Sequence, residues 1–119
     1  MNNKERGEVT IKAGEKSYTL RFSNKHLCAL EDDMDMDFQT ILALFDGRFP
    51  SMNYTRIMFR RGLVEHHGEM DYDAVSEIID NSDFTALMEG ILTAISLAFP
   101  STSGSKKKKS PAIGDGKSL

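Results

Sequence analysis

The chain has 119 residues, of which 39% are hydrophobic and 28% are charged, and its formal net charge is −3. This size and composition are typical of one globular domain and argue against a two-domain enzyme. The single cysteine, Cys28, excludes an intrachain disulfide and a multi-cysteine zinc site. We expect no membrane-spanning segment and no secretory signal, because the sequence has no apolar run of ~18 residues and no apolar stretch near its N-terminus.

The charge is divided unevenly along the chain. Residues 1–99 carry ten basic and seventeen acidic residues, a net charge of −7. Residues 100–119 carry five basic residues and one acidic residue, a net charge of +4. An acidic body is thus followed by a short basic tail, and the two need separate explanations.

Two stretches near the N-terminus alternate between apolar and polar residues. Their apolar positions are Val9, Ile11, Tyr18, Leu20 and Phe22. Between them, residues 13–16 form a short stretch that contains a glycine. This pattern predicts a β-hairpin over about residues 8–22. Because a two-stranded hairpin is barely stable alone, its apolar face is expected to pack on the rest of the domain.

Five helices are predicted after the hairpin, from apolar residues at helical spacing that follow capping residues. The expected caps are Ser23, Asp37, Asn53, Asp71 and either Ser82 or Asp83. The first helix is expected to end near Asp32, the third at Gly68 and the fifth, which has the strongest periodicity, near Phe99. Gly62 is a weak point of the third helix, since glycine costs ~1 kcal/mol in a helix interior.

The predicted fold class is α+β. An N-terminal β-hairpin packs on a small bundle of four to five helices, and the compact domain covers residues 1–99, with the helices over about residues 24–99. Residues 100–119 are rich in Lys, Ser and Gly. They are predicted to form a disordered tail, because so few apolar residues cannot offset the entropy lost on ordering.

One acidic segment has the spacing of a metal site. Asp33, Asp35 and Asp37 match the D-x-D-x-D start of an EF-hand calcium loop. That loop next needs a glycine and, six residues later, a bidentate glutamate, where this chain has Phe38 and Leu44. The segment is therefore expected to be an acidic connector whose last aspartate caps a helix.

No other residue pattern supports catalysis or metal binding. His66 and His67 are adjacent, so in a helix they point about 100° apart and are expected at a polar helix end. Cys28 has no base within reach and is expected to be a small core residue. The sequence also lacks a phosphate-binding loop and a nucleophile elbow. We therefore expect no catalytic, metal-binding or cofactor-binding residue, and no enzyme activity.

Two features are candidates for binding a partner protein. A basic patch on the third helix consists of Arg56, Arg60 and Arg61, and a row of small residues on the fifth consists of Ala86, Gly90, Ala94 and Ala98. The patch is expected to pair internally or to meet an acidic partner. The row is expected to pack tightly inside the domain or to form a seam with a partner. The candidate partner-binding residues are Arg56, Arg60, Arg61, Gly90, Leu92, Ala94 and Ile95.

The N-terminal stretch RGEVTIKAGEKSYTLRFSNKHLCALEDDM resembles a known family. It is similar to the tail assembly chaperones of long-tailed phages and gene transfer agents. The matching residues are Arg6, Gly7, Glu8, Val9, Gly14, Tyr18, Leu20, Arg21, Leu27, Leu30 and Glu31. The resemblance extends loosely over residues 5–99, where it depends on length and helix order.

The resemblance implies a protein-binding role without catalysis. Such chaperones bind the tape measure protein, keep its apolar faces from aggregating, and give way as tail tube protein polymerises. The implied partners are the tape measure protein, the tail tube protein, further copies of this chain and a frameshift-extended form of it. The implied location is the host cell cytoplasm, with the chain absent from the mature virion. No membrane partner is expected, and the acidic body disfavours nucleic acid.

The tail contains four consecutive lysines, Lys106, Lys107, Lys108 and Lys109. An unbroken run of adenines can encode them, and ribosomes slip on such runs. We hypothesise that they mark the point at which a frameshift yields a longer chaperone. The alternative is a solvated basic tail, or one attracted to acidic surfaces or nucleic acid. The alternative function is that of a small nucleic-acid-associated or regulatory phage protein that uses this basic tail.

Overall fold

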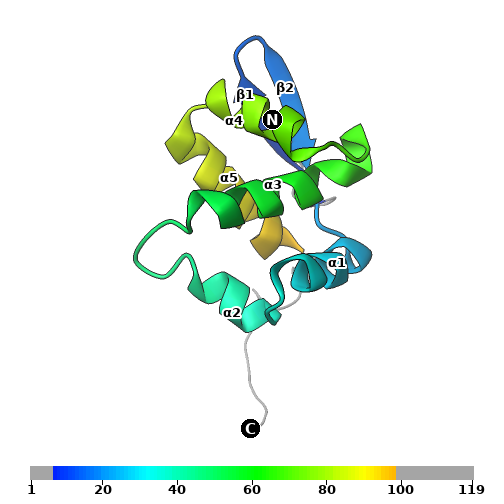
Figure 1. Cartoon of the computed structure of the whole chain (residues 1–119), viewed down its shortest axis with the longest axis vertical. Helices are drawn as coiled ribbons and strands as arrows, with labels where there is room; N and C mark the ends of the chain where they lie inside the picture. Colours follow the sequence, from blue (N-terminus) through cyan, green and yellow to red (C-terminus); the bar gives the residue numbers. More distant parts are fainter. Residues whose placement is uncertain (1–6, 99–119) are drawn as a thin grey trace, which may run out of the picture.

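The structure is a computed structural model and describes residues 7–98. It has an α+β fold, in which an N-terminal antiparallel hairpin packs on five helices (Figure 1). The elements are β1 (Val9–Ala13), β2 (Lys16–Leu20), α1 (Asn24–Met34), α2 (Phe38–Ala43), α3 (Met52–His67), α4 (Tyr72–Asp80) and α5 (Phe84–Leu97). The predicted tail, residues 100–119, lies outside the described residues.

The hairpin forms where the alternating pattern predicts it. Val9 pairs with Leu20 and Ala13 with Lys16, which leaves a two-residue turn. Gly14, the first residue of that turn, has a φ of 64°. This conformation at the first central position suits glycine and is typical of a type II′ turn. The strands are shorter than expected, since β2 ends at Leu20 rather than near Phe22.

The hairpin packs against α3 and α5, with α1 and α2 at the other end of the molecule (Figure 1). Two helical glycines allow this close approach. A Cβ on Gly62 of α3 would lie 2.8 Å from Cζ of Phe22, and one on Gly90 of α5 would overlap the side chain of Ile11. Gly62 lowers the intrinsic stability of α3, and the close packing against the hairpin that it allows offsets this cost.

Aspartate side chains begin three of the helices as predicted. Asp37, Asp71 and Asp83 each accept a hydrogen bond from the backbone N–H three residues later, at 2.8, 2.8 and 3.1 Å. The cap predicted for the third helix was wrong. Ser51 caps α3 by accepting from the N–H of Tyr54 at 3.2 Å, and Asn53 lies inside the first turn.

The core combines the inner face of the hairpin with apolar side chains from all five described helices. The prediction that Cys28 is a core residue was wrong, because the thiol-bearing side chain is exposed. On α1 the buried positions include Leu27, Leu30 and Met34, which follow helical spacing. Cys28 is one residue from Leu27 and so lies about 100° away, on the solvent side. Among the described helices, none combines the length and the apolar character needed to cross a membrane.

Candidate functional site

The centre of the row of small residues on α5 is packed inside the domain. Gly90, Ala94 and Ile95 are buried, and Gly90 faces Ile11 and Val9 of the hairpin. Leu92 is half-buried, while Ala86, at the start of the row, is exposed and Ala98, at its end, is half-buried. The two central residues of the row, Gly90 and Ala94, are therefore inaccessible in the folded domain and provide close packing, whereas Ala86 and Ala98 keep exposed surface.

The basic patch on α3 is used within the domain. Arg61 donates from Nε and Nη2 to the two carboxylate oxygens of Asp33, at 2.8 and 3.1 Å, and so joins α3 to α1. Arg60 donates from Nε to the carbonyl oxygen of Met70 at 2.6 Å. Arg56 and Arg60 both lie over the ring of Tyr72 in α4. Arg61 is thus paired with a carboxylate, whereas Arg56 and Arg60 are held mainly by uncharged groups, among them Ser76 and the Met70 carbonyl.

The three aspartates with EF-hand spacing do not converge on a metal. Asp33 binds Arg61, and Asp37 caps α2. Asp35 ends α1 in the left-handed conformation, with a φ of 54°. Within residues 7–98, no cluster of three or more metal-ligating side chains occurs.

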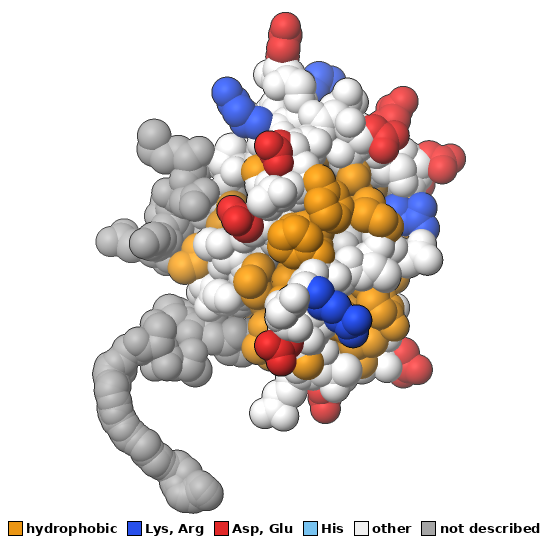
Figure 2. Space-filling model, turned by 90° about the vertical axis from the view of Figure 1, so that its left-hand side faces the viewer, with side chains coloured by type: hydrophobic (Ala, Val, Ile, Leu, Met, Phe, Trp, Pro, Cys, Tyr) orange, Lys and Arg blue, Asp and Glu red, His pale blue; other side chains and the backbone are white. Residues whose placement is uncertain are grey.

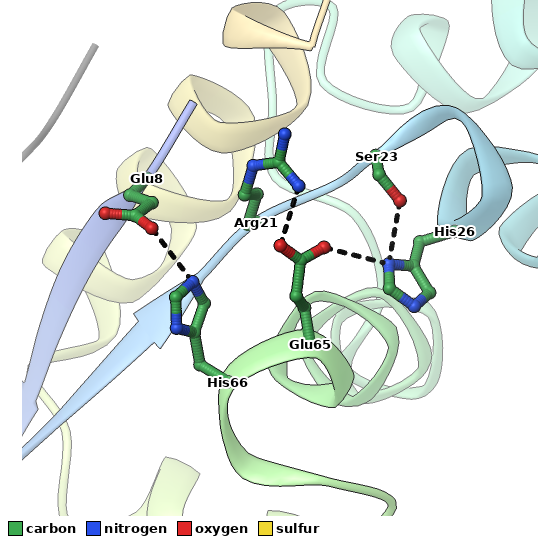
Figure 3. Close-up of polar contacts among 6 residues, drawn as sticks. All are labelled: Glu8, Arg21, Ser23, His26, Glu65 and His66. Atoms are coloured by element: carbon green, nitrogen blue, oxygen red, sulfur yellow. Dashed lines mark hydrogen bonds and ion pairs between the residues drawn. The ribbon is translucent and has the colours of Figure 1, made fainter. Parts of the chain in front are cut away.

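A polar cluster fastens the end of α3 to the hairpin and to α1 (Figure 3). Glu65 binds Arg21 at 2.7 Å and lies 3.7 Å from Nδ1 of His26. The Ser23 hydroxyl also lies near that nitrogen, at 3.1 Å. Ser23 occupies the predicted N-cap position of α1, but its hydroxyl does not make the expected hydrogen bond to the backbone of the helix. A Ser–His–acid triad holds its serine and its acid on different ring nitrogens. Because Ser23 and Glu65 share Nδ1, this cluster is not built as a nucleophile.

The two adjacent histidines end α3, as the sequence predicts, but both also contact the hairpin. Nε2 of His66 lies 3.0 Å from a carboxylate oxygen of Glu8 (Figure 3). Nε2 of His67 accepts a hydrogen bond from the backbone N–H of Thr19 at 2.9 Å. This contact gives one backbone donor on the outer edge of β2 a partner. Burial, and then the neighbouring His66, lower the pKa of His67. Burial likewise lowers the pKa of His26, although Glu65 opposes the shift.

The lowered pKa values of His26 and His67 make stability depend on pH. Below the ordinary histidine value of 6.5, the unfolded chain binds protons that the folded chain resists. We expect the urea midpoint of unfolding to fall as the pH is lowered from 7.5 to 5.5. In His67→Gln the midpoint should fall less over this pH range, because the glutamine side-chain oxygen can accept from the Thr19 N–H and does not titrate. An equally steep fall in the variant and in the wild type would contradict this role of His67.

Three of the five exposed large hydrophobic residues of the described chain lie elsewhere, around the loop between α2 and α3. The side chains of Phe49, Met52 and Phe84 are 46%, 50% and 41% exposed. The rings of Phe49 and Phe84 meet edge to face, with centroids 5.7 Å apart, so the loop contacts the first residue of α5. On the side of the molecule where this loop protrudes, hydrophobic side chains gather across the centre, and acidic side chains lie mostly toward the rim (Figure 2).

A shallow groove of about 340 Å³ continues this surface. Its lining comes from the loop and the start of α3 and consists of Leu44, Arg48, Phe49, Pro50, Ser51 and Tyr54. We call the groove, together with Met52 and Phe84, the loop surface. Contiguous apolar patches of this kind mark sites of interaction with other molecules.

The sequence does not predict the loop surface, because helical periodicity stops at the connector. Residues 46–51 have no regular spacing, and only the aromatic residue before Pro50 signals that the connector is apolar. The surface exists because the chain brings Phe84 next to Phe49, which is 35 positions earlier.

No protein-family model, curated protein or solved structure matches this chain.

Proposed function

We propose that the chain is a tail assembly chaperone of a long-tailed phage or prophage. In this role it binds apolar segments of the tape measure protein and helps to recruit tail tube protein. It acts in the host cytoplasm and is absent from the finished virion. The observation that carries the proposal is the loop surface, an exposed aromatic surface on a small acidic domain.

The loop surface suits an amphipathic helix. Such helices bind by placing apolar side chains, spaced three or four residues apart, into an apolar groove. Phe49 and Phe84 offer aromatic rings, and the groove between Phe49 and Tyr54 offers space for a further side chain. A surface of this size gives weak binding for one copy. Many copies along an elongated partner bind strongly together and can still be displaced one at a time.

The residues of the N-terminal motif support the scaffold rather than the loop surface. Gly7 and Gly14 both have positive φ values, of 71° and 64°. Leu20 and Leu30 are fully buried in the core. The motif thus coincides with positions that build the hairpin and its contacts. The nucleic-acid alternative depends on Lys106–Lys109, which lie outside the described residues, and no described feature favours it.

Co-expression with the tape measure protein encoded beside this chain tests the proposal. We expect the soluble fraction of the tape measure protein to rise several-fold when the chain is present, because its apolar faces are then covered. A small acidic protein of unrelated fold, expressed at the same level, serves as the control. If the tape measure protein is equally soluble without the chain, the proposal is wrong.

A further inference from the structure

We infer that Arg48 receives a carboxylate from the bound segment. The loop surface would then select an amphipathic helix that carries an acidic residue beside its apolar stripe. This inference rests on the proposed function and specifies the chemistry of its partner.

Arg48 differs from the other arginines of the described chain. Four of them have ion-pair, hydrogen-bond or cation–π partners, namely Arg21, Arg56, Arg60 and Arg61. Within residues 7–98, Arg48 makes neither an ion pair nor a hydrogen bond, and its side chain lines the groove next to Phe49. The loop surface therefore holds an uncommitted guanidinium among apolar side chains.

Binding changes the surroundings of this guanidinium. An apolar helix that covers Phe49 and Phe84 also removes water from the groove that Arg48 lines. Covering a guanidinium without offering an acceptor weakens binding, because its lost hydration is not replaced. A carboxylate replaces that hydration with charge-assisted hydrogen bonds, and the planar guanidinium can hold both of its oxygens.

The charge of the domain restricts the partner further. Residues 7–98 carry eight basic and sixteen acidic residues, a net charge of −8. An acidic segment is therefore repelled by most of the domain and attracted at Arg48. Asp83, next to Phe84, is already engaged as the cap of α5. The favoured segment has one carboxylate within its apolar stripe and neutral or basic residues on its other faces.

Peptides of 20 residues that together cover the tape measure protein test the inference. Their affinity for the full chain is measured by fluorescence anisotropy at low salt, and the tightest binder is carried forward. We expect Arg48→Gln to weaken its binding about fivefold, which is the upper range for a partly exposed ion pair, and Arg48→Glu to weaken it more. Replacing the peptide's acidic residue by lysine should weaken binding to the wild type and restore binding to Arg48→Glu. Lys25→Glu, an equal charge change at an exposed position on α1, is the matched control.

The outcomes separate this inference from the proposed function. If Arg48→Gln and Arg48→Glu bind as the wild type does, while Phe84→Asp does not bind, the loop surface is the site and the role of Arg48 is wrong. If the rescue by charge exchange fails, the inference is also wrong. If no peptide binds the wild type, the proposed function and the inference fall together.

Discussion

Phe84→Asp is expected to abolish the solubilising effect on the tape measure protein while the domain stays folded. Phe84 is 41% exposed, and its ring meets that of Phe49 within the loop surface. Truncating an aromatic residue at the centre of an interface costs about 2–4 kcal/mol of binding free energy, and a charge in its place adds desolvation. In a co-expression assay, the soluble fraction should return to the value seen without the chain.

The position of Phe84 keeps this test free of a folding artefact. It is the first residue of α5, directly after the Asp83 cap, where a carboxylate interacts favourably with the helix dipole. Thr85→Asp is the matched control, because Thr85 is exposed in the same turn and points about 100° away. Equal loss of solubilisation in both variants would mean that added charge, and not the aromatic face, matters.

Ile95→Asp is expected to prevent folding. Ile95 is fully buried in α5, within the core cluster that includes the hairpin. Losing a buried isoleucine side chain costs about 2–5 kcal/mol, and a buried carboxylate without a partner costs several more. Domains of this size are stable by only about 5–15 kcal/mol. Circular dichroism during heating should therefore show no cooperative transition.

Ser96→Asp provides the control for this variant. Ser96 is the next residue on α5 and is exposed, so the same charge meets water there. It should unfold within a few degrees of the wild type. If Ile95→Asp also unfolds cooperatively near that temperature, residue 95 is not part of the core, and a role at a partner interface becomes tenable again.

The spacing of apolar residues in the sequence predicts the hairpin and the helices, because each of these elements repeats a short local pattern. The alternation of Val9 and Ile11 with polar residues identifies the hairpin, and the apolar stripe of α5 identifies the closing helix. Capping was predicted at Asp37 and Asp71, and at either Ser82 or Asp83, because such side chains accept from the free N–H groups of a first turn. It was wrong at Asn53, since Ser51 is an equally good cap two residues earlier and local pattern does not separate them.

The candidate site was harder to predict, because it depends on tertiary neighbours. A row of small residues suits both an internal and an external contact, and only the position of Ile11 over Gly90 decides between them. The arginines of α3 look available in the sequence, but Asp33 lies 28 residues before its partner Arg61. Nothing in the sequence distinguishes Arg48, which lies in a connector. In the structure it is the one arginine of residues 7–98 without a hydrogen-bond or ion-pair partner.

The contact between β1 and α5 also determines when the domain can complete its fold during synthesis. The first strand leaves the ribosome long before the helix that covers it. Ile11 can pack against Gly90 only after α5 has been synthesised. Contacts between residues this far apart slow folding, because a long loop must close before they form. Until α5 emerges, Val9 and Ile11 of β1 lack the helix that covers them in the folded domain. A protein proposed to shield the apolar segments of another chain thus exposes an apolar segment of its own while it is being synthesised.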